Sequence, residues 1–248
     1  MRHFKSGELS MARALNGKNL TQHITHELGV AIVAGEYSGD AAFPTENQLC
    51  EKFSASRSVL REAVKMLTAK GLLAARPRQG TWVQDEEHWN LLDPDVLHWL
   101  LERKFSLSLI RQFTETRRAF ETQAAYFAAK KAKPASLEKI EEALKRMEAA
   151  QNGDDNPLQS DIAFHVAILH ASENPFYIQL EDLVSCALEY SIRLTNKFKG
   201  VPLASLEDHR AVYEAIRDGN AQDAADTMTN LIDEALDLIA KAEMSDGV

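Results

Sequence analysis

The sequence contains only two cysteines and no long apolar run. Cys50 and Cys186 form no Cys-x-x-Cys pair, which excludes the common zinc-ribbon and redox motifs. No stretch approaches the roughly 18 apolar residues of a membrane helix, and none combines a basic start, a short apolar core and a small-residue cleavage site. We therefore expect a cytoplasmic protein that makes no membrane contact.

Positive charge is also scarce, because 28 Lys and Arg residues stand against 37 Asp and Glu residues in a chain of 248. The shortage is uneven along the chain. Residues 44–83 hold seven basic and three acidic residues, whereas residues 89–248 hold 17 basic and 27 acidic ones. This asymmetry predicts a small anion-binding head attached to an acidic body.

Motifs of the common enzyme classes are missing as well. The sequence has no Gly-x-Ser-x-Gly elbow, no His-Glu-x-x-His pair and no glycine-rich phosphate loop. A metal with several carboxylates could support hydrolysis, but an enzyme of that kind would have no use for a basic head. We expect that the protein is not an enzyme.

Residues 44–83 have the pattern of a winged helix-turn-helix. Thr45 and Ser56 are suitable N-caps for two short helices, and Gly71 can end the second one. The expected elements are an unpatterned tail over 1–19, helices over 20–35, 45–53 and 57–69, and hairpin strands over 72–76 and 81–83. We place this DNA-binding domain at residues 20–84 and an acidic linker at 85–93.

The second helix of the pair carries a row of cations. Arg57, Arg61 and Lys65 are spaced four apart and so lie on one helix face. A solvated basic face is the usual reading of such a row, but a basic hairpin follows it in an otherwise acidic chain, which favours DNA. Arginine can pair bidentately with guanine in the major groove. The residues expected to contact DNA are Thr45, Ser56, Arg57, Ser58, Arg61, Lys65, Arg76, Arg78, Gln79 and Gly80.

The rest of the chain shows only helical periodicity. The expected helices cover 94–103, 107–132, 137–152, 157–172, 175–199, 205–217 and 221–244, with Pro, Gly and Asn at the breaks. Seven helices with short connections predict an antiparallel bundle. The fold class is therefore mainly α, with one helical domain over residues 94–248, to which the family resemblance given below assigns effector binding and dimerisation.

The pattern P-T-E-x-x-L-C-E-x-F-x-x-S-R-S-V-L-R-E-A, then L-x-x-K-G-L and R-x-G-T-W-V, resembles the GntR family of bacterial transcription regulators. The helical remainder resembles the FCD effector domain of the FadR-type subfamily, and residues 91–102 are similar to those of sugar-acid-responsive repressors, including galactonate-responsive ones. The resemblance implies a homodimeric repressor that binds a pseudo-palindromic double-stranded DNA operator and a small anionic effector. It places Asn47 where relatives have a DNA-binding arginine.

One candidate metal site lies in the helical part. Asp161 and His165 are four apart, and a carboxylate with imidazoles suits Zn, Ni, Mn or Fe. Taken alone, the pair also fits a buried core histidine or an exposed i,i+4 pair. The resemblance implies that Asp161, His165 and His209 bind a divalent metal, with Leu231 in place of a fourth ligand. Three ligands and an open position would admit water or a chelating effector.

The same resemblance implies an effector site. Arg117 and Glu121 match an R-x3-E motif whose arginine binds the effector carboxylate in relatives, and Arg193 is a second candidate. A structural salt bridge between Arg117 and Glu121 is the alternative. The effector is expected to be a sugar acid, with lactate or a fatty-acid derivative as the alternative. A helical metal-sensing or small-molecule-sensing module without a DNA role is the competing functional class.

Overall fold

The computed structural model describes residues 17–37, 42–76, 80–103, 106–199 and 205–246, and it describes their side chains except at 17–19, 193–199 and 245–246. Contacts divide the chain into two compact units, Met1–Phe105 and Ser106–Val248. Of the expected tail over 1–19, only residues 17–19 lie within the described range, and they begin the helix Gly17–Val33. Among the described residues, no helix combines the length and apolar character of a membrane span.

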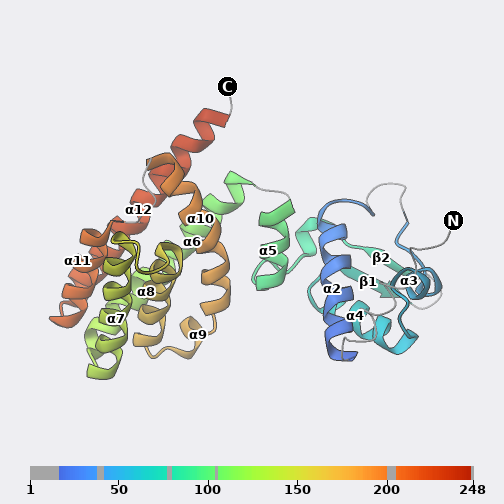
Figure 1. Cartoon of the computed structure of the whole chain (residues 1–248), viewed down its shortest axis with the longest axis horizontal. Coiled ribbons are helices and arrows are strands. Elements are labelled where there is room, and N and C mark those ends of the chain that lie inside the picture. Colours follow the sequence, from blue (N-terminus) through green and yellow to red (C-terminus); the bar gives the residue numbers. More distant parts are fainter. Residues whose placement is uncertain (1–16, 38–41, 77–79, 104–105, 200–204, 247–248) are drawn as a thin grey trace. The chain divides into compact units, whose positions relative to one another are not determined.

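The first unit is a winged helix-turn-helix, as expected from the sequence (Figure 1). Its elements are α2 (Gly17–Val33), α3 (Glu46–Phe53), α4 (Arg57–Ala69), β1 (Leu73–Arg76), β2 (Gly80–Val83), a short 3-10 turn (Glu86–His88) and α5 (Pro94–Arg103). The strands pair antiparallel, from Leu73 opposite Val83 to Arg76 opposite Gly80. The helices bury the apolar stripes that their periodicity predicts, including Ile24, Leu28, Leu49, Leu60 and Leu67.

Side-chain caps fix where α3 and α4 begin. The Thr45 hydroxyl accepts a hydrogen bond from the Gln48 backbone N–H, and the Gln48 side chain accepts one from the Thr45 backbone N–H. Ser56 caps α4 by accepting from the Val59 N–H. Between the two helices, Ser54 adopts a left-handed conformation with φ of 48°. These local bonds set the angle at which α4 leaves the turn.

Helix α5 packs within the first unit, although the sequence analysis assigned residues 94–103 to the second domain. The Trp99 Nε1 donates a hydrogen bond to His26 Nδ1 on α2 over 3.0 Å. Lys70, at the end of α4, forms ion pairs of 2.8 Å with Asp93 and Asp95 at the start of α5. Helix α5 buries its apolar face within the first unit. Helical periodicity predicts such a face but does not show which domain it packs against.

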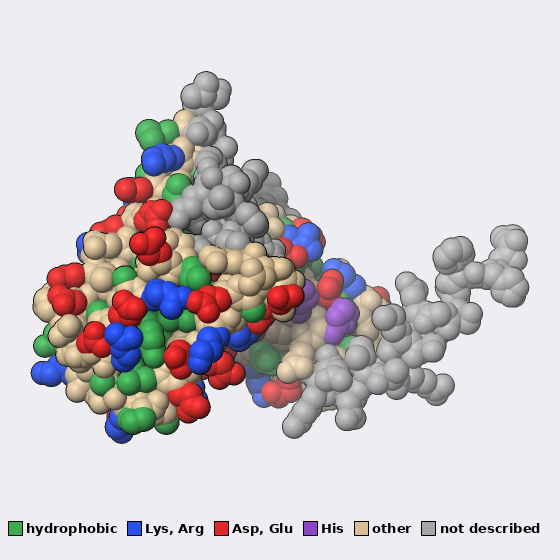
Figure 2. All heavy atoms as spheres, turned by 60° about the vertical axis from the view of Figure 1, so that its left-hand side comes forward, with side chains coloured by type: hydrophobic (Ala, Val, Ile, Leu, Met, Phe, Trp, Pro, Cys, Tyr) green, Lys and Arg blue, Asp and Glu red, His purple; other side chains and the backbone are tan. Residues whose placement is uncertain are grey.

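The second unit is an all-α bundle built from α6 (Leu107–Lys131), α7 (Pro134–Gln151), α8 (Pro157–Ala171), α9 (Pro175–Ile178), α10 (Glu181–Lys199), α11 (Leu206–Arg217) and α12 (Ala221–Asp246). Helices α6 and α12 pack along each other, and α8 contacts α6, α7 and α10. Phe164, Ile168 and Leu169 of α8 are fully buried in the core. Figure 2 shows acidic side chains scattered over this unit's surface with Lys and Arg among them.

The expected single helix over 175–199 is instead two helices, α9 and α10. Asn174 caps α9 and Pro175 occupies its first turn, as in a regular helix start. After one turn the backbone tightens, because the Leu180 N–H bonds to the Tyr177 carbonyl. Glu181 and Asp182 then begin α10, where acidic residues favour a helix start. The apolar spacing continues across this break and therefore conceals it in the sequence.

Candidate functional site

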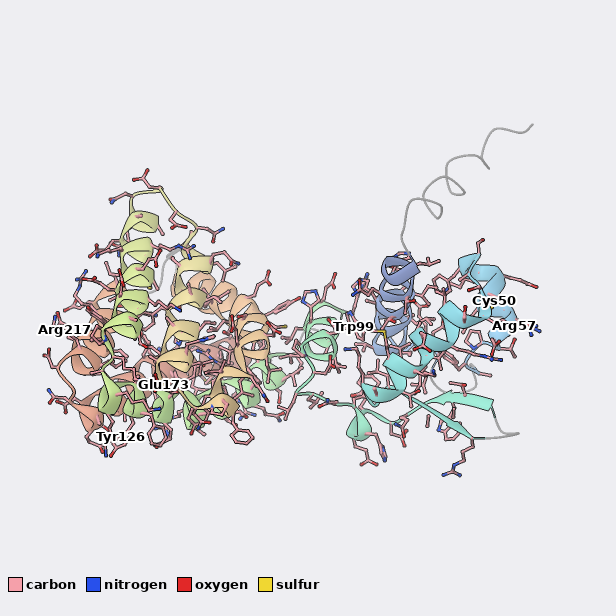
Figure 3. All side chains as sticks on the ribbon, turned by 90° about the horizontal axis from the view of Figure 1, so that it is seen from below. Cys50, Arg57, Trp99, Tyr126, Glu173 and Arg217 are labelled. Carbon is pink, nitrogen blue, oxygen red and sulfur yellow. The ribbon has the colours of Figure 1, made fainter. Side chains whose placement is uncertain are left out.

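The row of cations expected to face DNA lies on the exposed side of α4. The side chains of Arg57, Arg61 and Lys65 are 67%, 65% and 71% exposed. Figure 3 shows Arg57 pointing outward from the first unit. Solvent-exposed guanidinium groups on the second helix of a helix-turn-helix are available for phosphates and base edges.

The remaining residues expected to contact DNA occupy several settings. Thr45 and Ser56 use their hydroxyls as helix caps, and Ser58 Oγ lies 3.0 Å from Ser56 Oγ. The Arg76 guanidinium lies 5.5 Å from the Trp82 ring centre. Gly80 has φ of +87° with open space around it, which suits close approach of another molecule to the main chain. Arg78 and Gln79 lie outside the described residues.

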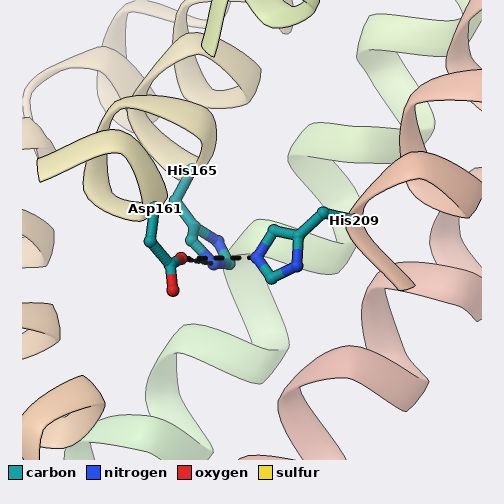
Figure 4. A group of neighbouring side chains, drawn as sticks. All are labelled: Asp161, His165 and His209. Carbon is teal, nitrogen blue, oxygen red and sulfur yellow. Dashed lines mark hydrogen bonds and ion pairs between the residues drawn. The ribbon is translucent and has the colours of Figure 1, made fainter. Parts of the chain in front are cut away.

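Buried polar side chains gather in the second unit around Asp161 (Figure 4). Asp161 Oδ1 lies 3.4 Å from His165 Nε2 and 3.3 Å from His209 Nε2. All three residues are at most 4% exposed, and one ligand atom from each lies within 4.8 Å of the others. Helix spacing brings Asp161 and His165 together on α8, and packing of α11 brings His209 to them.

The other ring nitrogen of each histidine is held by an oxygen acceptor. His165 Nδ1 lies 2.6 Å from Glu121 Oε2, and His209 Nδ1 lies 2.7 Å from the Ser205 carbonyl oxygen. An imidazole that donates from Nδ1 presents the Nε2 lone pair on its other side when it is neutral. Two such lone pairs and a carboxylate oxygen then converge, and a bound cation would stabilise this arrangement. The residues therefore fit a divalent metal of the Zn, Ni, Mn or Fe group.

Arg117 and Glu121 form a buried ion pair on α6. Arg117 Nε lies 2.6 Å from Glu121 Oε1, and the two residues are 3% and 1% exposed. Glu121 thus bonds to both Arg117 and His165, and it joins the expected effector residues to the expected metal ligands. The salt bridge expected as the alternative for these two residues is therefore present, and it is buried rather than exposed.

The charges of this cluster and its burial shift the pKa values of its side chains in opposite directions. Burial raises the pKa of Glu121, but the positive charges of Arg117 and His165 outweigh it and hold the pKa at about 2. Burial likewise favours a neutral Asp161, yet His209 and His165 hold the pKa of that carboxyl well below its usual range. Burial lowers the pKa of His165, while Glu121 and Asp161 raise it above its ordinary value. Both carboxylates are therefore ionised at neutral pH.

A pocket opens beside the cluster. The pocket is small, with a cavity volume of about 60 Å³, and part of it is open to solvent. The polar wall comes from Arg117, Asp161, His165, Ser191, Ser205, His209 and Glu234, and the apolar wall from Leu188, Ile192, Leu231, Ile232, Ala235 and Leu238. Arg117 faces this space, whereas Glu121 lies behind Arg117 and His165. The side chain of Arg193 is outside the described set.

Several residues of the two sites make contacts that the sequence does not predict. Ser205 was not assigned a role, although its position four residues before His209, at a helix start, is a signal for a backbone contact. Glu234 and Ser191 line the pocket without any motif that would mark them. In the first unit, Asn47 Oδ1 accepts a hydrogen bond from Arg57 over 3.1 Å. Glu46 Oε1 also lies 3.7 Å from Arg57 Nε.

Comparisons with known proteins give matches over both units. Residues 20–83 match the model of the bacterial regulatory proteins of the gntR family, and residues 112–234 match that of the FCD domain. The chain is 35% identical to the galactonate operon transcriptional repressor of Escherichia coli (strain K12), over 84% of this chain and 92% of the relative. It is 31% identical to the regulator LutR of Bacillus subtilis (strain 168), over 78% and 89%.

A solved structure agrees with the fold. Lar, which controls expression of the Listeria monocytogenes agr system, is 19% identical and superposes with a TM-score of 0.59. The match covers 97% of this chain and 99% of Lar. At this identity the likeness supports the arrangement of elements and nothing about ligands.

Proposed function

Because the chain belongs to the GntR family of bacterial transcription regulators and carries an FCD domain, we propose that it represses a catabolic operon and releases DNA on binding a small carboxylate. Members of this family are transcription regulators and not enzymes, and they bind DNA operators. The proposal adds the direction of regulation, the class of effector and the residues that bind it.

On the DNA side, α4 enters the major groove and Arg57 and Arg61 read or clamp the duplex. The support is their exposure on the second helix of the helix-turn-helix. Arg76 and Gly80 of the hairpin reach the backbone or minor groove. A homodimer with two such heads would require a pseudo-palindromic operator, since a two-fold protein fits a two-fold site.

On the effector side, Arg117 binds the carboxylate. The observation that carries this proposal is the buried bond network from Arg117 through Glu121 and His165 to Asp161 and His209, which borders a pocket. Glu121 holds the Arg117 fork and the His165 ring, so both present a fixed face to the pocket. When bound, a divalent metal would supply a Lewis-acid contact for a carboxylate or hydroxyl oxygen.

A sugar acid is the effector class that we favour. The named relative acts at a galactonate operon, and Leu231, which lines the pocket, cannot be a fourth metal ligand, so a coordination position would remain for a chelating molecule. A shorter carboxylate is the second candidate, because a 28% identical Escherichia coli relative is named a putative regulator of an L-lactate dehydrogenase operon.

Sequence selection tests the DNA-binding role. Random duplexes are selected with the wild-type protein at about 100 mM salt, and the enriched duplex is labelled and titrated by fluorescence anisotropy. We expect a two-fold symmetric consensus and affinity that falls steeply as salt rises. Enrichment of no sequence would overturn the DNA-binding proposal.

Thermal shifts test the effector class. Galactonate, related sugar acids, lactate and a fatty acid are added with Zn²⁺ or with EDTA, because a ligand selective for the native state raises its melting temperature. We expect a sugar acid with metal to give the largest rise. A larger rise with lactate would favour the second candidate.

A further inference from the structure

A carboxylate stands between the two arginines of α4 that are proposed to contact DNA. Glu46 Oε2 lies 3.1 Å from Arg61 Nε, and Glu46 Oε1 lies 3.7 Å from Arg57 Nε. Glu46 belongs to α3, so these contacts join the two helices of the helix-turn-helix. Arg57 also donates a hydrogen bond of 3.1 Å to Asn47, which lies next to Glu46 on α3.

The backbone at Glu46 is fixed by the start of α3. Thr45 and Gln48 form the capping box on either side of it, and an acidic residue in a first turn is favoured by the helix dipole. The Glu46 side chain is 36% exposed, half the exposure of the arginines that it contacts. A fixed carboxylate therefore restricts two otherwise flexible guanidinium groups.

This arrangement is a poor device for stability. Ion pairs between exposed side chains contribute little, because solvent screens them and ordering the side chains costs entropy. It is also unfavourable for general DNA affinity, since a negative charge beside the arginines repels phosphates. The contact with Glu46 instead fixes the direction of the guanidinium groups. Reading a base edge depends on that direction, whereas contact with a phosphate does not depend on it.

We propose that Glu46 is a positioning residue for DNA reading, which orients Arg57 and Arg61 so that their forks meet base edges in place of phosphates. The inference rests on the proposed function, in which α4 reads DNA. Glu46 itself need not touch DNA. It raises the ratio of specific to nonspecific affinity by restricting the arginines and by weakening their attraction to any phosphate.

Two substitutions test this role. Glu46→Gln keeps the size of the side chain but removes the charge that both arginines share, and Glu46→Ala removes the contact altogether. The matched control is Glu62→Gln, which removes the same charge from an exposed ion pair with Lys65 in the same motif but leaves Arg57 and Arg61 alone. Each variant is titrated against the duplex selected by the wild-type protein and against a random duplex.

We expect Glu46→Ala to lower the ratio of specific to nonspecific affinity about tenfold, the size of one lost base contact. Nonspecific affinity should rise in that variant, and repeated selection should lose sequence preference at only the positions that Arg57 and Arg61 read. Glu46→Gln should also lower the ratio of specific to nonspecific affinity, and Glu62→Gln should leave that ratio unchanged.

An unchanged ratio in both Glu46 variants, or equal tightening on both duplexes, would overturn the inference and leave the DNA-binding proposal intact. Loss of the ratio together with loss of helical signal by circular dichroism would assign Glu46 a structural role instead. Failure of the wild-type protein to select any sequence would count against the proposed function itself.

Discussion

Asp161 lies at the centre of the proposed metal and effector site. Its Oδ1 atom is near Nε2 of both His165 and His209, while Nδ1 of each histidine is held from behind by Glu121 or by the Ser205 carbonyl. Each ring is therefore oriented at both nitrogens. Fixed ligands of this kind are what metal centres use to set ligand direction and basicity.

The Glu121 carboxylate is expected to be essential for the stability of the second unit. In Glu121→Gln, the buried Arg117 guanidinium loses its ionic partner, and breaking a buried pair in this way costs about 3 kcal/mol. The control is Glu115→Gln on the same helix, whose pair with Arg111 has the same spacing but is exposed. Denaturant unfolding should show a loss below about 1 kcal/mol for the control. Equal losses in the two variants would contradict the buried network.

Metal binding is expected to weaken as pH falls. Glu121 and Asp161 raise the pKa of His165 despite its burial, so its imidazole retains a proton to a higher pH than usual. A metal can bind Nε2 only after that proton leaves. Zn²⁺ affinity should therefore fall as pH falls, by up to about tenfold per pH unit where the pH lies below the raised pKa of His165. Titration calorimetry in buffers of different ionisation enthalpy should detect proton release, and affinity independent of pH would contradict this assignment.

Helix α5 lies in the first unit, although we expected residues 94–103 to belong to the second domain. It packs on α2, where a Cβ atom at Gly29 would lie 2.3 Å from the Trp99 ring. Lys70 of the α4 end bonds to Asp93 and Asp95 at the start of α5. The end of the proposed reading helix is therefore attached to the helix that precedes the second unit.

The substitution Gly29→Ala tests this packing, because the packing decides whether the substitution raises or lowers the free energy of unfolding. Replacing glycine by alanine within a helix ordinarily stabilises by about 0.5–1 kcal/mol. Here the added methyl group meets the Trp99 ring, so we expect a loss of about 1–3 kcal/mol by overpacking. In a Trp99→Ala background, Gly29→Ala should instead stabilise the protein, as it ordinarily does within a helix. Higher stability of the single variant would show that Trp99 does not occupy that position.

Sequence patterns predicted the elements well where local chemistry determines them. The caps at Thr45 and Ser56, the exposed row on α4 and the pairing of Asp161 with His165 all follow from spacing along one or two helices. Contacts across the bundle do not, because Glu121 and His165 are 44 residues apart and only packing brings them within 2.6 Å. The approach of His209 was anticipated through resemblance alone.

The two units differ in charge, because residues 1–105 hold 13 basic and 13 acidic residues whereas residues 106–248 hold 15 basic and 24 acidic ones. The first unit offers exposed cations to DNA, and the second encloses ionised carboxylates and histidines beside a pocket. A ligand can release DNA only if it binds one conformation of the protein more tightly than another. The proposed coupling is therefore a difference in the affinity of the effector for the free protein and for the DNA-bound protein.

DNA release is the measurement that tests this coupling most directly. The labelled duplex selected by the wild-type protein is bound, and galactonate is titrated in the presence of Zn²⁺ or of EDTA while anisotropy is recorded. We predict release with Zn²⁺ and little release with EDTA or in His209→Ala, whereas His170→Ala, which changes a half-exposed histidine on the same helix as His165, should behave as wild type. Release that is equal with Zn²⁺, with EDTA and in His209→Ala would contradict the account.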